Sequence, residues 1–375
     1  MHSPNPFTIQ VVQTPHDFCN PSQEIADLQS FAHNGENVVL FSPRRFGKSS
    51  LVFIVQKALQ KEGMMTAYID LFPIASKNDF LQRLAHGLIK GIGKGIQARS
   101  WIDKIKGLFK HIQPVMSVGQ EGFDFSLEWN PKSEMPILLE DLLTGVNTYI
   151  ERNKLRASIA LDEFQEITEL EESKEIEGLL RSHIQTQRKI SYYFIGSRRR
   201  ILSDMFNNKN RPFYKSAFNY PLAKISSKDF VPFIEKRFRE TKKKCPEKIA
   251  ALLYEKVEGY PYYVQKLAYL VWEKTEKEAG EETLEKSHQD LLRLEKADFE
   301  AVWSGLSLGQ RSLLKTLALE PIQSPYSKAF LEKQGLSLGG TQKAMEALLA
   351  KDLIEEGEKG FQLVDPIMAA WLKAQ

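Results

Sequence analysis

A turn of basic and small residues follows the apolar segment 37–41, and its residue types suit the binding of phosphate groups. The turn reads Ser42-Pro43-Arg44-Arg45-Phe46-Gly47-Lys48-Ser49-Ser50. Backbone N–H groups of a tight loop and of a helix N-terminus can point at phosphates, and Lys48 adds a positive charge beside them. The Ser49 hydroxyl is the type of ligand that holds magnesium in such a turn. The turn therefore predicts a site for ATP and Mg²⁺.

The turn departs from the common pattern G-x-x-x-x-G-K-S/T at its first position, where Ser42 stands in place of glycine. That first glycine begins the turn, whereas Gly47 is the residue that lets the backbone approach a phosphate. Ser42 therefore lowers the specificity of the match without removing a ligand. The alternative is a chance Gly-Lys-Ser sequence at the start of an ordinary helix.

Two carboxylates, Asp162 and Glu163, end a second buried apolar segment, 157–161. In a parallel sheet the carboxyl ends of the strands form the edge at which ligands bind. We expect Asp162 to hold magnesium, usually through water, and Glu163 to orient and polarise the attacking water. The Lys48 ammonium and both carboxylates are expected to converge from neighbouring strands on one magnesium–triphosphate. Taken alone, the acidic pair is also compatible with a polar strand end that enters a turn.

Apolar segments alternate with amphipathic ones over residues 37–222, which predicts an α/β fold with a parallel sheet covered on both faces. Strands are expected at 37–41, 65–72, 157–161, 190–195 and 217–222. Helices are expected at 23–32, 47–60, 79–92, 94–110, 137–153 and 169–187. Gly119 and Gly122, followed by strict apolar–polar alternation over 123–129, predict a β-hairpin.

Beyond residue 225 the strand pattern stops and helices dominate. Helical patterns cover 229–241, 247–256, 262–278, 298–305, 308–319 and 340–350, and 353–364 resembles a small β-ribbon. Helices followed by a ribbon suggest a winged-helix domain. We therefore expect an ATPase core at 1–224 with a hairpin insertion at 112–131, a helical lid at 225–295 and a winged helix at 296–375.

The bulk properties are those of a soluble globular protein. The 375 residues carry a formal net charge of +3, which neither demands nor excludes a nucleic-acid partner. Two cysteines, Cys19 and Cys245, fit no metal-binding spacing and favour a reducing, cytoplasmic setting. The first residues lack the order of a signal peptide, and no apolar run reaches the length of a spanning helix, so we expect no membrane partner.

With these motifs in hand, the chain resembles the archaeal-type ATPases of the STAND branch of AAA-related P-loop proteins over nearly its whole length. The resemblance is strongest at 42–51, 161–166, 195–199 and 259–263, and it extends to Val364-Asp365-Pro366 and Trp371. The Arg44-Arg45 pair is specific to this group. The resemblance implies a five-stranded ATPase core, a helical lid and a C-terminal winged helix.

The resemblance also implies roles for particular residues. Ser197, at the end of the fourth strand, takes the sensor-1 place near the γ-phosphate. Pro261 begins a lid helix that closes over the nucleotide. The segment 18–24 lies where the family frames the adenine, but Pro21 and Ser22 stand where the family commonly has arginine and glutamate.

Several arginines lie next to the predicted site. Arg198, the first of three consecutive arginines, is a candidate for stabilising the charge that develops during hydrolysis; a solvated helix start with acidic partners is the alternative. Arg44 and Arg45 suit either phosphate neutralisation or a tie between the loop and the lid, and the sequence does not separate these roles.

Three functions are compatible with these features. The first is a slow ATPase that acts as a nucleotide-dependent conformational switch. The second is a DNA-associated ATPase anchored by its winged helix, and the third is a nucleotide-binding scaffold with negligible turnover. Residues from 297 onward are slightly acidic in balance, whereas a DNA reader normally carries a basic stripe. Docking on the ATPase, a protein partner or self-association is therefore favoured over DNA.

Overall fold

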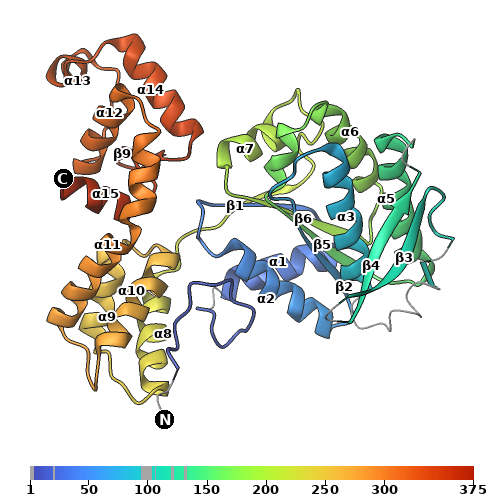
Figure 1. Ribbon diagram of the computed structural model, residues 1–375, viewed down its shortest axis with the longest axis horizontal. Helices are drawn as coiled ribbons and strands as arrows, with labels where there is room; N and C mark the ends of the chain where they lie inside the picture. Colours follow the sequence, from blue (N-terminus) through green and yellow to red (C-terminus); the bar gives the residue numbers. More distant parts are fainter. Residues whose placement is uncertain (1–3, 20–21, 94–103, 106, 120–121, 131–132) are drawn as a thin grey trace. The chain divides into compact units, whose positions relative to one another are not determined.

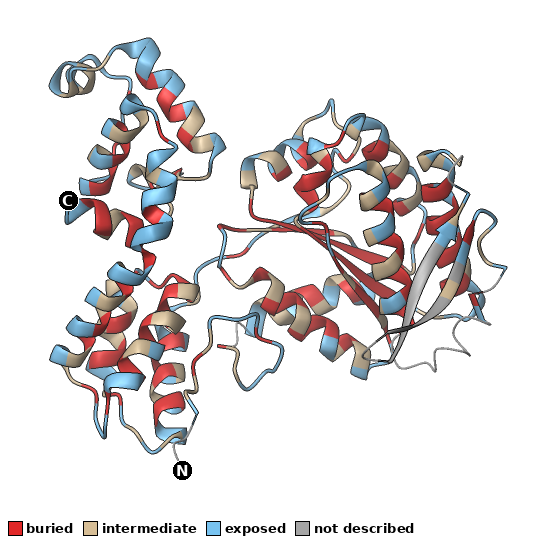
Figure 2. Cartoon of the chain, viewed as in Figure 1, coloured by how far each residue is buried: buried red, intermediate tan, exposed pale blue. Residues whose placement is uncertain are grey.

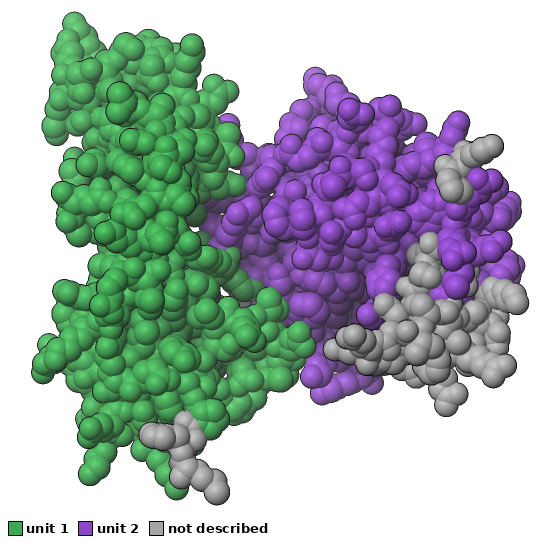
Figure 3. All heavy atoms as spheres, in the orientation of Figure 1, with its two compact units in different colours: residues 1–20, 45–47, 224–375 green, residues 21–44, 48–223 purple. Residues whose placement is uncertain are grey.

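The structure, a computed structural model, forms two compact units (Figure 3). It describes all residues except 1–3, 20–21, 94–103, 106, 120–121 and 131–132. The sheet unit consists of residues 21–44 and 48–223. The helical unit consists of residues 1–20, 45–47 and 224–375.

The sheet unit is built on five parallel strands in the order β2-β5-β6-β1-β7 (Figure 1). The strands are β1 (Val38–Phe41), β2 (Met65–Asp70), β5 (Ala157–Asp162), β6 (Ile190–Gly196) and β7 (Phe218–Pro221). All residues of β5 and β6 are buried, as Figure 2 shows, which is why these two segments are nearly continuous apolar runs. The predicted parallel α/β sheet is confirmed.

The expectation that the turn and the acidic pair follow neighbouring strands is wrong. Strand β6 lies between β1 and β5 and pairs with both, with Val39 opposite Phe194 and Ile159 opposite Tyr192. The helix that follows β1, α2 (Lys48–Lys61), contacts both β5 and β2. Its first turn therefore brings the residues after the phosphate turn across β6 to the end of β5.

Helices accompany the strands along the chain, as the alternation predicted. Besides α2 they are α1 (Ser22–Asn34), α3 (Lys77–Ile92), α5 (Met135–Arg152), the 3₁₀ helix η1 (Phe164–Glu169), α6 (Ser173–Ile184) and α7 (Arg199–Asn207). The helix expected from residue 169 begins only at Ser173, because the residues directly after Glu163 form η1. No range was predicted for helix α7, although a helix start at the three arginines was one alternative.

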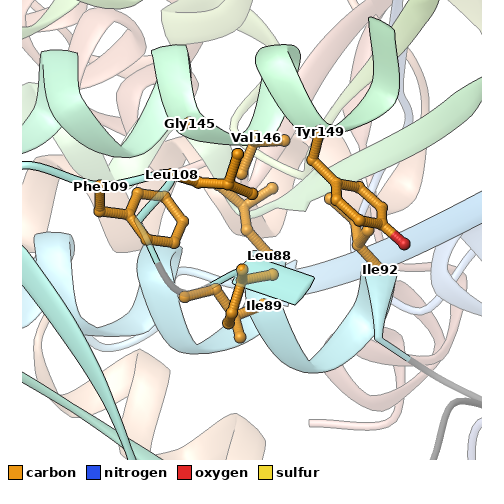
Figure 4. A pocket seen from close by; sticks show the side chains of 9 residues that line it. Leu88, Ile89, Ile92, Leu108, Phe109, Gly145, Val146 and Tyr149 are labelled. Carbon is orange, nitrogen blue, oxygen red and sulfur yellow. The ribbon is translucent and has the colours of Figure 1, made fainter. Parts of the chain in front are cut away.

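Helix α3 packs unusually close to strand β2. A Cβ atom placed on Gly87 would lie 2.4 Å from Ile69, and one on Gly91 would lie 2.5 Å from Ala67. On its other side α3 faces α5, and their side chains, with Leu108 and Phe109, surround a small apolar cavity (Figure 4). The two glycines therefore set the spacing between this helix and the sheet.

The predicted hairpin is present. Strands β3 (Ile112–Gly119) and β4 (Gly122–Trp129) pair antiparallel in a separate two-stranded sheet. Buried Asp141 of α5 accepts hydrogen bonds from the backbone N–H groups of Lys110, His111 and Ile112, at 2.8, 2.7 and 3.2 Å. Most of the helix expected at 94–110 lies outside the described residues.

The helical unit contains two sets of elements that share one hydrophobic core. The first set is α8 (Ser227–Glu240), α9 (Glu247–Lys256), α10 (Pro261–Lys274) and α11 (Glu281–Ser304). The second set is α12 (Leu308–Leu319), α13 (Lys328–Gln334), α14 (Leu338–Ala350), β8 (Ile354–Gly357), β9 (Gly360–Leu363) and α15 (Pro366–Lys373). The expected boundary at 295/296 falls inside α11, a continuous helix of 24 residues, and the short helix expected at 298–305 is its end.

Residues 1–20, which we expected in the ATPase core, belong to the helical unit instead. The ring of Phe7 packs on Phe238 with centroids 5.4 Å apart. The guanidinium of Arg237, only 5% exposed, donates to the Pro6 carbonyl at 3.1 Å and pairs with Asp17 at 2.8 Å. A buried charge needs such partners, and the N-terminal segment supplies them.

Within the described residues, no helix combines the length and the apolar character that crossing a membrane requires.

Candidate active site

The turn between β1 and α2 has the backbone of a tight loop that opens a helix. Gly47 has φ of +87°, and no atom lies within 4 Å of the position its Cβ would take, so backbone conformation rather than space favours glycine there. The Lys48 ammonium donates to the carbonyl oxygens of Ser42 at 2.9 Å and Pro43 at 3.0 Å. It also lies 3.4 Å from the Ser42 hydroxyl, a contact that glycine in this place would not offer.

Lys48 is a buried cation, 6% exposed, and within the described part of the chain its ammonium donates only to neutral oxygens. Burial lowers the pKa of its ammonium to about 8, while the more distant charges of Glu163 and Asp162 oppose that shift. Among the described residues, no carboxylate forms an ion pair with it. The charge therefore suits an anionic ligand delivered to the turn.

The Asp162 carboxylate, at the end of β5, accepts hydrogen bonds from three donors. Its Oδ2 accepts from the Ser49 hydroxyl at 2.8 Å and also from the Tyr68 hydroxyl, and its Oδ1 accepts from the Glu163 backbone N–H at 2.9 Å. Burial and the charge of Asp162 raise the pKa of Tyr68, so its hydroxyl stays a donor. The serine after Lys48 and the first carboxylate are thus brought together as the sequence predicted.

Glu163 has a left-handed backbone, with φ of +50°, and its carboxylate is held by side chains from two elements. The Ser197 hydroxyl, just beyond β6, lies 3.1 and 3.3 Å from the two carboxylate oxygens. The Gln165 amide of η1 donates to Oε2. Arg44 donates to the Ser197 hydroxyl at 3.4 Å, which links the phosphate turn to Glu163 through one side chain.

Three residues near these carboxylates received no role from the sequence: Tyr68, Asp70 and Gln165. Asp70 ends β2 in register with Asp162, and its Oδ1 accepts from the Phe72 backbone N–H at 2.9 Å. Burial, together with the charges of Asp162 and Glu163, raises the pKa of Asp70. The strand predicted at 65–72 ends at Asp70 in the structure, and an aspartate near the end of a predicted strand was a usable signal, because the carboxyl ends of parallel strands meet at one edge.

Arg198 precedes the first residue of α7 and has acidic partners, which is the alternative that the sequence offered for it. Its guanidinium pairs with Glu169 at 2.8 Å and with Glu166 at 3.7 Å, both on η1. Ser50, within the first turn of α2, is buried. Pro261 is the first residue of α10, as predicted.

The two arginines of the turn have different partners. Arg44 contacts Ser197, whereas Arg45 contacts residues of the helical unit. The Arg45 guanidinium lies 4.4 Å from the centre of the Tyr262 ring and 3.4 Å from the carboxylate of buried Glu295. Its neighbour Phe46 meets Tyr260 edge to face at 4.8 Å. The tie to the helices therefore belongs to Arg45, a distinction that the sequence left open.

Comparison with known proteins identifies the C-terminal part. Residues 297–374 match the family described as a probable winged helix domain, which agrees with the predicted winged helix. No curated protein matches the chain.

Solved structures resemble the whole chain. A Walker-type ATPase of Pyrococcus abyssi, paby2304, is 17% identical with a TM-score of 0.71, and the match covers 98% of this chain and 99% of that one. The Aeropyrum pernix ORC2 protein, solved as ADPNP–ADP complexes, is 15% identical with a TM-score of 0.55, over 94% of this chain and 93% of that one. The chain has the AAA-like P-loop NTPase fold, with a five-stranded parallel sheet and its helices, and a C-terminal winged helix.

Proposed function

We propose that the chain binds ATP with Mg²⁺ and hydrolyses it slowly, and that it acts as a nucleotide-dependent conformational switch of the STAND type. The observation that carries this proposal is the 2.8 Å hydrogen bond between Ser49, directly after Lys48, and Asp162, directly before Glu163. It joins a phosphate-type turn to a pair of carboxylates across an intervening strand.

The residues present fit both ligands. The segment Ser42 to Ser50, with Arg44, Arg45 and Phe46 at its middle, would surround the phosphates, and Lys48 is a buried cation whose acceptors in the described part of the chain are neutral oxygens. Ser49 and Asp162 offer the oxygen ligands that Mg²⁺ prefers. Bound Mg²⁺ would neutralise charge on the phosphate oxygens.

The side chains around the carboxylates have distinct roles in this proposal. Glu163 accepts a proton from, and orients, the attacking water. Ser197 holds the Glu163 carboxylate and takes the sensor-1 role. Arg198 stabilises developing charge after leaving Glu166 and Glu169, and Pro261 begins the helix that closes on the nucleotide.

The switch is supported by the chain positions of Arg45 and Phe46. They lie in the phosphate turn, yet their partners Tyr262, Glu295 and Tyr260 lie in α10 and α11 or directly before them. A ligand that changes the turn therefore acts on residues tied to these helices.

The test compares Lys48→Ala and Glu163→Gln with wild type. Lys48→Ala is expected to lose ATP binding, measured by calorimetry, while its circular dichroism spectrum and melting temperature show a folded protein. Glu163→Gln is expected to bind ATP and release no phosphate. If Lys48→Ala kept its affinity for ATP, the proposed binding site would be refuted. If wild type bound ATP and released no phosphate, the protein would be a nucleotide-binding scaffold and not an ATPase.

A protein partner or self-association is proposed over DNA, because the winged-helix residues hold more Asp and Glu than Lys and Arg. Phosphate release is therefore expected to be the same with and without duplex DNA. Binding to DNA that weakens steeply with added salt would instead favour the DNA-associated ATPase.

A further inference from the structure

Gln165 is completely buried, yet only one end of its side-chain amide is satisfied. Its exposed fraction is 0%, and its Nε2 donates to the Glu163 carboxylate. Its Oε1 has no hydrogen-bond partner within the part of the chain that the structure describes. Among the described residues, the one hydrogen-bond partner of this amide is thus the carboxylate expected to orient water.

An unpartnered buried oxygen destabilises a fold, so a side chain chosen for stability alone would be apolar here. Gln187 offers the contrast within the same unit. It is also buried, but its Nε2 donates to the Leu143 carbonyl at 3.1 Å and its Oε1 accepts from the Tyr192 hydroxyl at 2.5 Å. A buried polar atom that lacks a partner, with no evident gain in stability, is typical of a functional position.

The fold also leaves room for this particular amide. A Cβ atom on Gly196, at the end of β6, would lie 2.0 Å from the Gln165 Oε1. Any side chain at position 196 would therefore displace the amide. The reverse amide orientation would turn Oε1 toward the negative Glu163 carboxylate, so electrostatics favours the orientation with Nε2 facing it.

Gln165 and Ser197 hold one carboxylate from two elements. Ser197 follows β6 and Gln165 lies in η1, and Glu163 itself has a left-handed backbone. Fixing both the backbone and the two carboxylate oxygens restricts where Glu163 can direct its charge.

We infer that Gln165 is a positioning residue that holds Glu163 for water activation, an inference that rests on the proposed ATPase function. Its amide donates to the carboxylate of Glu163 and is kept for that contact rather than for the stability of the fold. It acts through Glu163 and touches no reacting atom itself.

The test sets Gln165→Leu against Gln187→Leu. For Gln165→Leu we expect kcat to fall by at least about tenfold with KM changed less than about twofold, because the lost contact acts on water activation and not on binding. Its melting temperature should stay the same or rise. Gln187→Leu should lower the melting temperature and leave kcat unchanged. A Gln165→Leu protein with wild-type kcat, or one that loses activity and stability together, would overturn the inference.

A second measurement needs neither nucleotide nor turnover. In ligand-free protein the Gln165 side-chain amide proton facing Glu163 should resonate downfield, and it should move upfield in Glu163→Ala. Identical amide signals in the two proteins would overturn the inference. If wild type releases no phosphate, the hydrolysis proposal fails, while this measurement still decides whether Gln165 and Glu163 are joined.

Discussion

Lys48 is an enclosed positive charge, and its protonation is linked to folding. Burial lowers its pKa from 10.5 to about 8, so the unfolded chain holds more protons than the folded one between these values. Stability of the ligand-free protein should therefore rise with pH over that window, by at most about 3 kcal/mol. Below the window both states are protonated and the full burial penalty applies.

Urea unfolding at several pH values checks this linkage against Lys48→Met, which cannot be protonated. The unfolding free energy of wild type relative to that variant should increase as the pH rises from 8 towards 10.5. A difference that stays constant over the window would contradict a depressed pKa at Lys48.

Single residues show what the sequence can and cannot reveal about the site. The proximity of Ser49 and Asp162 was predictable, because one was expected in the turn after a strand and the other at the end of a strand of the same parallel sheet. Gln165 carried no such signal, since its amide fits only because Gly196, at the end of β6, has no side chain. Likewise, the separate partners of Arg44 and Arg45 come from segments far apart in the sequence.

The contact between α3 and β2 depends on the absence of side chains at two helix positions. Gly91→Ala should destabilise the protein by about 1–3 kcal/mol, because the new methyl group would meet the Ala67 backbone. Gly178→Ala, in α6 where no atom lies within 4 Å, should instead stabilise it by about 0.5–1 kcal/mol. Chemical denaturation measures the change in unfolding free energy of each variant. Equal changes in the two variants would argue against the close approach of α3 to β2.

Helices and strands were predictable where their burial produced a simple apolar pattern in the sequence. The buried runs β5 and β6 were expected, whereas the order of the strands was not, since β6 enters between β1 and β5 by tertiary pairing. Helix α13 has no buried residue and was missed, because an exposed helix leaves no apolar stripe to detect. Helix α11 was expected only at its end, since much of its surface is charged.

A partly buried hydrogen bond joins the two sets of elements in the helical unit. Tyr263 of α10 donates to Asp365 at 2.6 Å, and Asp365 also caps α15 by accepting from the backbone N–H groups of Ile367 and Met368. Burial raises the pKa of Asp365, while these three donors oppose the shift. The helices and the winged helix should therefore unfold as one cooperative body.

Removing that bond should weaken the whole unit. Tyr263→Phe is expected to lower the unfolding free energy by about 1–3 kcal/mol, because it withdraws one donor from a partly buried carboxylate. In calorimetry the shift should appear in a single transition for residues 224–375. Tyr269→Phe, at a side chain that is 39% exposed, is the control and should have an effect below about 0.5 kcal/mol. Separate transitions for the helices and the winged helix would contradict the shared core.

The partners of Arg45 and Phe46 have a practical consequence for dissecting this protein. A fragment ending at residue 223 would retain the five strands, the lysine and both carboxylates, yet it would lack Tyr260, Tyr262 and Glu295. Its turn would expose an aromatic ring and an unpaired guanidinium to solvent. A titration of such a fragment with ATP would then report on an altered turn. The affinity for ATP should therefore be measured on the intact chain.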